Sequence, residues 1–266
     1  PLPQHIFDAS TLTSTAKGQQ TTYRRQVHLY TRAHPWTKFG IDLLLGANAD
    51  KPLTESQYVF LPDHFCHFAA NLCLENQADS TKTSPQISPL VEAFKVINHP
   101  QEIAESQSDV ITKLTTPFIL LCFSALLIII ISFYGFLLAR FSMLLDATLS
   151  LVLGLAGCCL LLMVFSEHPT VSLNLQILML NPLLLASLFA FFGMMFRLKS
   201  LSGSPTDYFA NKYVKIFYLF LYPICLVAFF ACIPLQHYAE GLLSLAAAIF
   251  LRIVLIHFSK HHKLHL

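Results

Sequence analysis

Long apolar runs alternate with short polar stretches in the second half of the chain. Five of these runs have about the 20 apolar residues that a helix needs to cross the ~30 Å hydrocarbon core of a bilayer. They cover residues 117–139, 147–165, 175–196, 216–234 and 241–259. Only the last contains a charged residue, Arg252. The pattern therefore predicts five transmembrane helices.

The first half of the chain shows shorter, amphipathic segments. Residues 21–32, 35–46 and 62–76 each place apolar side chains on one face of a helix. Residues 77–88 are polar and predict a loop, and residues 89–98 suggest a short strand. We predict a mainly α membrane protein, in which a small, mostly helical segment, residues 1–116, precedes a five-helix transmembrane domain, residues 117–266.

Composition agrees with this division. Apolar residues make up 55% of the chain and charged residues 12%, against roughly 25% charged residues in a soluble domain. Both a soluble globular protein and a disordered one are thereby disfavoured. Arginine and lysine form no stripe interleaved with aromatic residues, so we expect no nucleic-acid partner.

The basic residues are distributed unevenly between the loops. Residues 166–174 and 235–240, after the second and fourth predicted helices, contain no Lys or Arg. The stretches after the first, third and fifth contain seven, namely Arg140, Arg197, Lys199, Lys212, Lys215, Lys260 and Lys263. Cytoplasmic loops carry such an excess. We therefore expect a multi-pass protein of the bacterial inner membrane, with residues 1–116 in the periplasm and the C-terminus in the cytoplasm.

Several polar residues gather at the predicted periplasmic face. This candidate membrane-face site comprises Glu167, His168, Asn174, Asn181, His237 and Glu240. Interface solvation and helix capping explain such residues, and so does the positioning of a lipid headgroup or an acyl donor. The two histidines and a glutamate follow no zinc-ligand spacing, so we expect no metal, and the sequence indicates no cofactor.

Arg252 is predicted to lie at membrane depth, where a charge is costly. Either its side chain extends to the near interface or it pairs with Asp146 at the end of the second helix. Gly154 and Gly157 on that second helix suggest a close contact with a neighbouring helix.

Part of the chain resembles a known family. The string from His34 to Gly46, with Asp50 and the preceding Tyr23-Arg24 pair, resembles the end of the Lnb N-terminal periplasmic domain. The second half resembles the membrane region of the same proteins through Phe165–Pro169, Asn181-Pro182 and Gln236-His237. The matching residues that we expect to be structural are Arg24, Trp36, Gly40, Asp42, Gly46, Asp146 and Arg252.

The resemblance implies a lipoprotein N-acyltransferase. Such an enzyme moves a fatty acyl chain from a membrane lipid, the donor, to the α-amine of a lipoprotein's N-terminal cysteine, the acceptor. Its extracytoplasmic domain is papain-like α+β, with a catalytic His in a Phe-Gly-His motif and a Cys in an Asn-Cys-Thr-type motif. Neither motif occurs here.

We therefore expect the catalytic pair upstream of Pro1, and we interpret the chain as the C-terminal portion of the enzyme, inactive alone. The alternative is a non-catalytic, multi-span membrane anchor with a partner-binding periplasmic domain.

Overall fold

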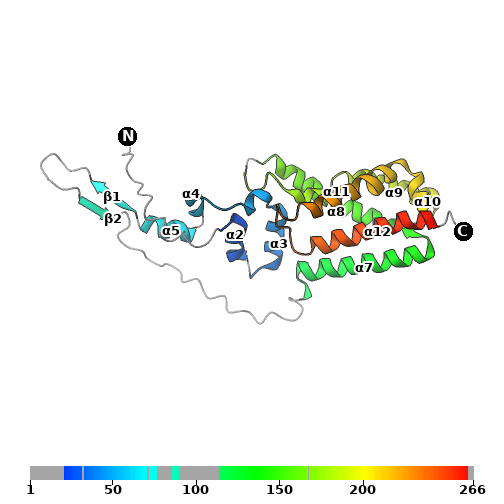
Figure 1. The fold of residues 1–266 in the computed structure, drawn as a ribbon, viewed down its shortest axis with the longest axis horizontal. Coiled ribbons are helices and arrows are strands. Elements are labelled where there is room, and N and C mark those ends of the chain that lie inside the picture. The colour runs from blue at the N-terminus through cyan, green and yellow to red at the C-terminus, as the bar shows by residue number, and fades with distance from the viewer. Residues whose placement is uncertain are drawn as a thin grey trace. The chain divides into compact units, whose positions relative to one another are not determined.

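The computed structural model describes residues 21–31, 33–60, 62–70, 72–76, 86–89, 114–166 and 168–262. The chain divides into two compact units. One unit joins Arg24–Lys51 to Ser108–Leu266, and the other joins Pro1–Tyr23 to Pro52–Gln107. A segment from the first half of the sequence thus packs with the apolar second half, whose helices run from green to red in Figure 1.

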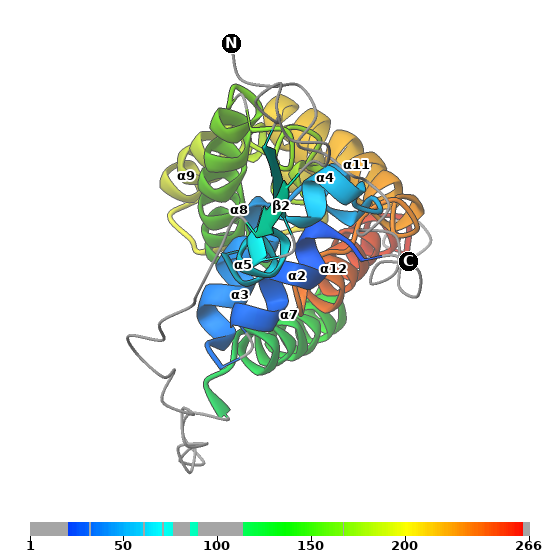
Figure 2. The same cartoon turned by 90° about the vertical axis from the view of Figure 1, so that its left-hand side faces the viewer.

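Within the larger unit, the described helices form an apolar bundle. Four helical stretches are long and apolar enough to cross a membrane. They are α7 (Pro117–Leu138), α8 (Met143–Val164), η3 with α11 (Val214–Leu221 and Tyr222–Ala231) and α12 (Leu242–His262). Helix α12 packs along α7, and α8 packs along α9 (Leu184–Leu198). Figure 2 shows this bundle end-on, and the prediction of a mainly α membrane protein is confirmed.

The third predicted helix is shorter than expected. In place of one helix over 175–196, the chain forms η2 (Leu175–Leu178), an irregular stretch and then the 15-residue α9, which is about 22 Å long at 1.5 Å per residue. Pro182 has no N–H to donate to a continuous helix. The Asn181 side chain instead accepts a hydrogen bond from the Leu183 N–H at 3.0 Å.

The two glycines of α8 accommodate this irregular stretch. A Cβ on Gly157 would lie 2.2 Å from the Leu180 carbonyl oxygen, and a Cβ on Gly154 would lie 2.8 Å from the Leu185 side chain. The predicted close contact at these glycines is confirmed. It joins α8 to the start of α9 and to the backbone just before it.

The fourth span changes its helical form midway. Residues of η3 form a π-helix, and α11 begins with Pro223 in its first turn. Because proline cannot donate a backbone hydrogen bond, the regular pattern has to change near this position.

Short elements close the end of the bundle that carries Arg140 and Lys199, which we call the basic end. Strand β3 (Phe141–Ser142) pairs antiparallel with β4 (Ser202–Gly203), and α10 (Pro205–Ala210) follows. The pairing brings the connection between α7 and α8 against the connection after α9. These contacts cover a buried ion pair.

Arg252 and Asp146 form that pair, and neither side chain is exposed. The guanidinium contacts both carboxylate oxygens, with Nε at 2.6 Å from Oδ1 and Nη2 at 2.8 Å from Oδ2. The Tyr218 hydroxyl donates to Oδ1 and the Tyr208 hydroxyl to Oδ2. Of the two alternatives for Arg252, the structure therefore shows pairing with Asp146. Two further groups, Ser132 Oγ and the Ser142 carbonyl, accept hydrogen bonds from Arg252.

Tyr208 lies on α10, outside the membrane-spanning helices. Burial, and then the neighbouring Asp146 carboxylate, raise the pKa of its hydroxyl well above its ordinary value. The hydroxyl therefore stays protonated at physiological pH and remains a donor to the carboxylate.

The smaller unit contains short elements in its described part. They are α4 (Glu55–Tyr58), α5 (Pro62–Ala70), β1 (Cys73–Asn76) and β2 (Gln86–Pro89). The helix predicted over 62–76 was therefore too long, because its last residues pair as a strand with β2. The end of the predicted loop, residues 86–88, belongs to that partner strand. Residues 90–98 of the predicted strand lie outside the described residues.

Candidate functional site

The segment Arg24–Lys51, here called the docking segment, folds into three short elements. Helix α2 (Tyr23–Thr31) begins just before it, and α3 (Pro35–Leu44) and η1 (Ala47–Asp50) follow. Pro35 suits the first turn of α3, where its missing N–H costs nothing. The helices predicted over 21–32 and 35–46 are confirmed, and each is slightly shorter than its prediction.

Arg24 holds these three elements together. Its Nε donates to Asp50 Oδ1 at 2.7 Å, and its Nη1 donates to Asp42 Oδ1 at 2.8 Å. Its Nη2 contacts Asp50 Oδ2 at 3.2 Å and the Leu45 carbonyl at 3.1 Å. His28 Nε2 lies 2.8 Å from the same Asp42 oxygen. Only 3% of Arg24 is exposed, so one buried cation links α2, α3 and η1.

Three side-chain amides connect the docking segment to the bundle. Asn174 Nδ2 donates to the Leu43 carbonyl at 2.7 Å, and Gln176 Nε2 donates to the Asp42 carbonyl at 2.8 Å. Gln236 Nε2 donates to the Leu45 carbonyl at 3.1 Å. All three amides are buried. They satisfy the carbonyls left free at the end of α3, which would be costly to bury without partners.

The same amides also hold the loops of the bundle in place. Gln236 Oε1 accepts from the Leu175 N–H at 2.7 Å, and Gln176 Oε1 accepts from the Ala239 N–H at 3.1 Å. We call residues 168–176 and 233–240 the receiving loops. Because each amide serves a loop and the docking segment at once, the two parts form one polar network.

Backbone contacts add to this network at Gly46 and Ala47. The Gly46 N–H donates to the Thr170 carbonyl at 2.8 Å, and the Ala47 N–H donates to the Leu173 carbonyl at 2.7 Å. A Cβ on Gly46 would lie 2.3 Å from the Leu173 oxygen. Its φ of −89° is open to any residue, so close approach, and not backbone conformation, requires glycine here.

We therefore expect Gly46→Ala to loosen the docking segment. Overpacking costs about 1–3 kcal/mol, which corresponds to a roughly 5- to 150-fold larger population of the undocked segment. Limited proteolysis of the purified chain should show correspondingly faster cleavage within residues 33–51.

Gly40→Ala is the matched control. A Cβ on Gly40 would meet nothing within 4 Å, and alanine favours the helix that contains it. Its cleavage rate should equal that of the unmodified chain. Equal rates for both variants would contradict a tight contact at Gly46.

The structure brings together only part of the predicted membrane-face site. Asn174 lies in the network, and the His237 N–H donates to Asp50 Oδ2 at 2.9 Å. Glu240 forms an exposed ion pair with Lys38. His168 Nδ1 lies 2.7 Å from Thr170 Oγ1 within its own loop.

The two other predicted residues have to be treated separately. The Asn181 side-chain oxygen accepts from the Leu183 N–H just before α9, and its Nδ2 lies 3.5 Å from Cys225 Sγ on α11. These bonds do not join Asn181 to the polar network, and its place in one common polar site stays a prediction. Glu167 lies outside the described residues.

Of the residues predicted to be structural, Arg24, Asp42 and Gly46 are central to the docking contacts. Trp36 is largely exposed, and its Nε1 donates to the Thr115 carbonyl at 2.9 Å. This bond ties α3 to the residues just before α7. Gly40 makes no close contact that would require glycine.

Our prediction of the site left out Gln176 and Gln236. Both could have been recognised from the sequence as amide side chains beside apolar segments, because a buried amide needs a hydrogen-bond partner. No local pattern identifies that partner. Asp50, which the sequence analysis named only as part of a motif, forms a salt bridge with Arg24.

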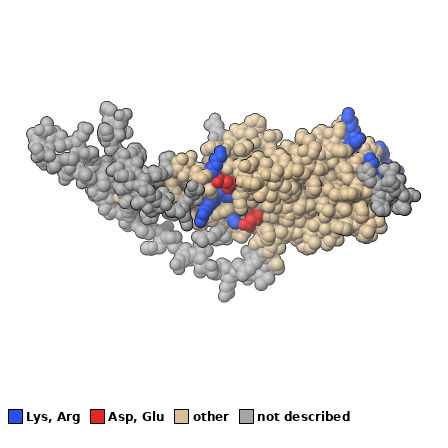
Figure 3. Space-filling view, in the orientation of Figure 1, with Lys and Arg blue, Asp and Glu red and all other residues tan. Residues whose placement is uncertain are grey.

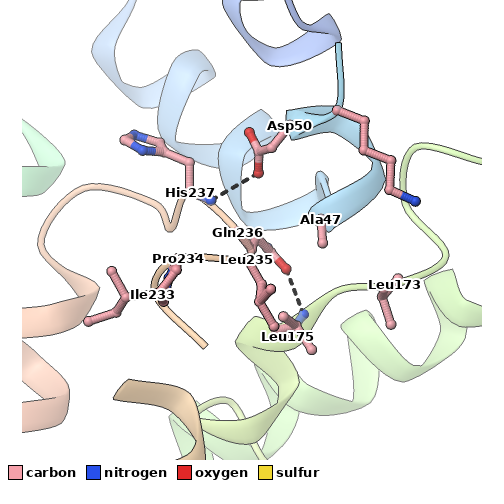
Figure 4. A pocket seen from close by; sticks show the side chains of 10 residues that line it. Ala47, Asp50, Leu173, Leu175, Ile233, Pro234, Leu235, Gln236 and His237 are labelled. Atoms are coloured by element: carbon pink, nitrogen blue, oxygen red, sulfur yellow. Dashed lines mark hydrogen bonds between the residues drawn. The ribbon is translucent and has the colours of Figure 1, made fainter. Parts of the chain in front are cut away.

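The network leaves few polar groups free for chemistry. Among the described residues, no group of three or more His, Cys, Asp and Glu side chains could hold a metal ion. Beside the network lies a cavity of about 480 Å³ between η1 and the receiving loops. In Figure 4, Asp50 and Ala47 lie above it, Ile233 and Pro234 on one side, and Leu173 on the other.

Comparison with known proteins identifies the larger part of the chain. Residues 107–263 match the family model of the Lnb transmembrane domain. No curated protein and no solved structure matches the chain. The match extends from just before α7 to the end of α12 and covers more than half of the sequence, so the chain is a multi-pass membrane protein that belongs to the Lnb family.

Proposed function

We propose that this chain is the membrane-embedded part of a lipoprotein N-acyltransferase, with the nucleophile supplied by sequence upstream of Pro1. The observation that best supports this proposal is the polar network between the docking segment and the receiving loops. A catalytic domain continuous with the docking segment would be held at one end of the bundle. Membrane lipids would then be the acyl donors, and lipoprotein N-termini the acceptors.

The proposed chemistry needs this arrangement because both substrates are anchored in the bilayer. A cysteine thiolate would attack the ester carbonyl of the donor lipid, and the C–O bond would break as the released alcohol takes a proton. The neutral lipoprotein α-amine would then attack the thioester carbonyl and the C–S bond would break. The proton lost by the amine would return to the catalytic His, which gave one to the alcohol in the first step, so that the thiolate is regenerated. Both steps require the reacting atoms to meet at the membrane surface.

A non-catalytic membrane anchor is the second candidate. The observation that favours it is that the amides of Asn174, Gln176 and Gln236 all donate hydrogen bonds that hold the docking segment in place. In that case the docking segment would present a binding domain and not an active site.

Lipoprotein acylation separates the two candidates. In a strain without its own N-acyltransferase, we expect the complete reading frame to restore N-acylation, as measured by mass spectrometry of lipoprotein N-termini. Residues 1–266, expressed alone, should leave the α-amine free, because the proposal places the nucleophile upstream of Pro1. A free amine with the complete, normally abundant protein would favour the anchor.

We further propose that the basic end faces the cytoplasm of the bacterial inner membrane, which places the docking segment in the periplasm. Figure 3 shows Lys and Arg at the end of the bundle opposite the docking segment. The exposed residues Arg140, Arg197, Lys199, Lys212 and Lys215 carry this charge. The receiving loops contain no Lys or Arg, and this asymmetry supports the proposed orientation.

Reporter fusions test this orientation. Fusions after Lys199 and after Lys263 should both report a cytoplasmic location, because an even number of spans separates the two positions. A fusion after Ser172, in a receiving loop, should report the periplasm. A periplasmic result at Lys199 would contradict the five-span topology.

A further inference from the structure

One face of α3 extends past the edge of the bundle. Phe39 and Leu43 lie on this face and pack against the hydrophobic core of the larger unit. Trp36 lies on the same face, because side chains three and four positions apart in a helix are neighbours. Its ring contacts the Phe39 ring, with 6.2 Å between the centroids, yet 56% of Trp36 is exposed. The bundle therefore covers this face at Phe39 and Leu43 but leaves much of it open at Trp36.

The open end of this face adjoins the start of a membrane-spanning helix. Trp36 Nε1 donates to the Thr115 carbonyl at 2.9 Å, and α7 begins two residues later, at Pro117. In Figure 1, α3 lies beside this end of α7. The 22 residues of α7 are about 33 Å long at 1.5 Å per residue, close to the ~30 Å hydrocarbon core. The first turn of α7, and with it Trp36, therefore lies at the surface of the bilayer.

Two further exposed side chains lie across the turn that leads into α3. Leu29 and Tyr30 belong to the last turn of α2, and the connection to α3 is tight, with the His34 N–H donating to the Thr31 carbonyl at 2.9 Å. Leu29, Tyr30 and Trp36 are each at least half exposed. We call these three residues the α2–α3 tip. It presents an aliphatic side chain and two aromatic rings at the level where α7 enters the hydrocarbon.

This composition suits the boundary between lipid and water. Tryptophan and tyrosine are enriched there because each combines an apolar ring with a polar group. The polar group of Trp36 already has a protein partner in the Thr115 carbonyl. Its ring can therefore contact lipid without the loss of a hydrogen bond. Phe118, in the first turn of α7, is also exposed, so the tip continues an apolar surface that the bilayer covers.

We propose that the α2–α3 tip inserts into the lipid interface beside α7 and anchors the docking segment there. Lipid covers the exposed faces of Leu29, Tyr30 and Trp36. The polar network fixes the docking segment on the bundle, and the tip fixes it on the bilayer, so a domain continuous with the segment is held at a set height and tilt. This inference goes beyond the proposed function, because it applies equally to an enzyme and to a membrane anchor.

Tryptophan fluorescence tests the proposal, because Trp36 is the only tryptophan in the chain. The protein is placed in phosphatidylcholine nanodiscs whose lipids carry bromine on one acyl chain, either near the glycerol or near the chain end. Bromine near the glycerol should remove at least half of the emission, and bromine near the chain end clearly less. Iodide in the water should quench Trp36 at most a third as strongly as it quenches free tryptophan.

Three results would overturn the proposal. Strong quenching by iodide with little quenching by either lipid would place the tip in water. Protection from both lipid and iodide would mean that protein covers it. Stronger quenching by bromine near the chain end would place the ring deeper than the interface.

A charge at Leu29 tests whether the tip itself makes the lipid contact. Glutamate is compatible with the helix, but a carboxylate is costly to place among acyl chains. Leu29→Glu should therefore reduce the quenching by bromine near the glycerol at least twofold and increase the quenching by iodide. Leu44→Glu is the matched control, since Leu44 is also exposed in the last turn of its helix and lies about 12 Å along α3 from Trp36. It should leave both kinds of quenching unchanged.

Hydrogen exchange shows whether the docking segment stays in place in these variants. The Gly46 N–H donates to the Thr170 carbonyl, and its exchange rate should be the same in both variants as in the unmodified chain. Undiminished lipid quenching in Leu29→Glu would refute the role assigned to the tip. None of these measurements requires acyl transfer, so the tip and the acyltransferase proposal can fail independently.

Discussion

Arg252→Met should prevent the bundle from reaching its normal stability. Asp146 would then be a buried carboxylate with two tyrosine hydroxyls but no cation. Removing one partner of a buried ion pair costs about 3–5 kcal/mol, a large part of the 5–15 kcal/mol that stabilises a typical protein. We expect a marked fall in the thermal unfolding midpoint of the detergent-purified protein and a lower amount in the membrane.

Two further variants show whether this loss arises from the ion pair. Lys215→Met removes an exposed charge and should change stability by no more than about 0.5 kcal/mol. The double variant Asp146→Asn/Arg252→Met should recover part of the loss, because no unpaired charge stays buried. An Arg252→Met variant that unfolds at the normal temperature would show that the pair contributes little.

Arg24→Gln should release the docking segment while leaving the bundle folded. Asp42 is almost fully buried, and its remaining contact would be His28. Among the described residues, Asp42 Oδ2 already has no hydrogen-bond partner. A loss of about 3–5 kcal/mol corresponds to a roughly 150- to 5,000-fold larger population of the undocked segment.

Hydrogen exchange measures this release directly. The Gly46 and Ala47 amides donate to the receiving loops, so their exchange should accelerate at least a hundredfold, while amides in the middle of α7 should keep their rates. Lys38→Gln breaks only the pair with Glu240, whose side chains are 26% and 49% exposed. Exposed pairs contribute about 0–1 kcal/mol, so this control should change exchange at most several-fold. Unchanged Gly46 exchange in Arg24→Gln would refute the role assigned to Arg24.

Hydropathy predicted the helix boundaries well where the need to satisfy backbone hydrogen bonds in a bilayer dominates. The first predicted span, residues 117–139, agrees with α7 to within one residue, because an uninterrupted apolar run has no alternative to a helix in a bilayer. The prediction of the third span as one helix was wrong at Asn181-Pro182. Hydropathy stays high there, but Pro182 has no backbone N–H to donate to a continuous helix. The helix predicted over 62–76 was too long, because its last residues pair with β2 as a strand.

The sequence by itself determined that this is a helical membrane protein with an uneven distribution of basic residues, because hydropathy and loop charge are local properties. It left open whether Arg252 pairs with Asp146, and it grouped Asn181 with Asn174. Only the tertiary structure decided those contacts and joined Arg24, Asp42 and Asp50 to the receiving loops. The reason is physical: a buried polar group needs a partner, but packing between segments distant in sequence determines which partner comes within reach.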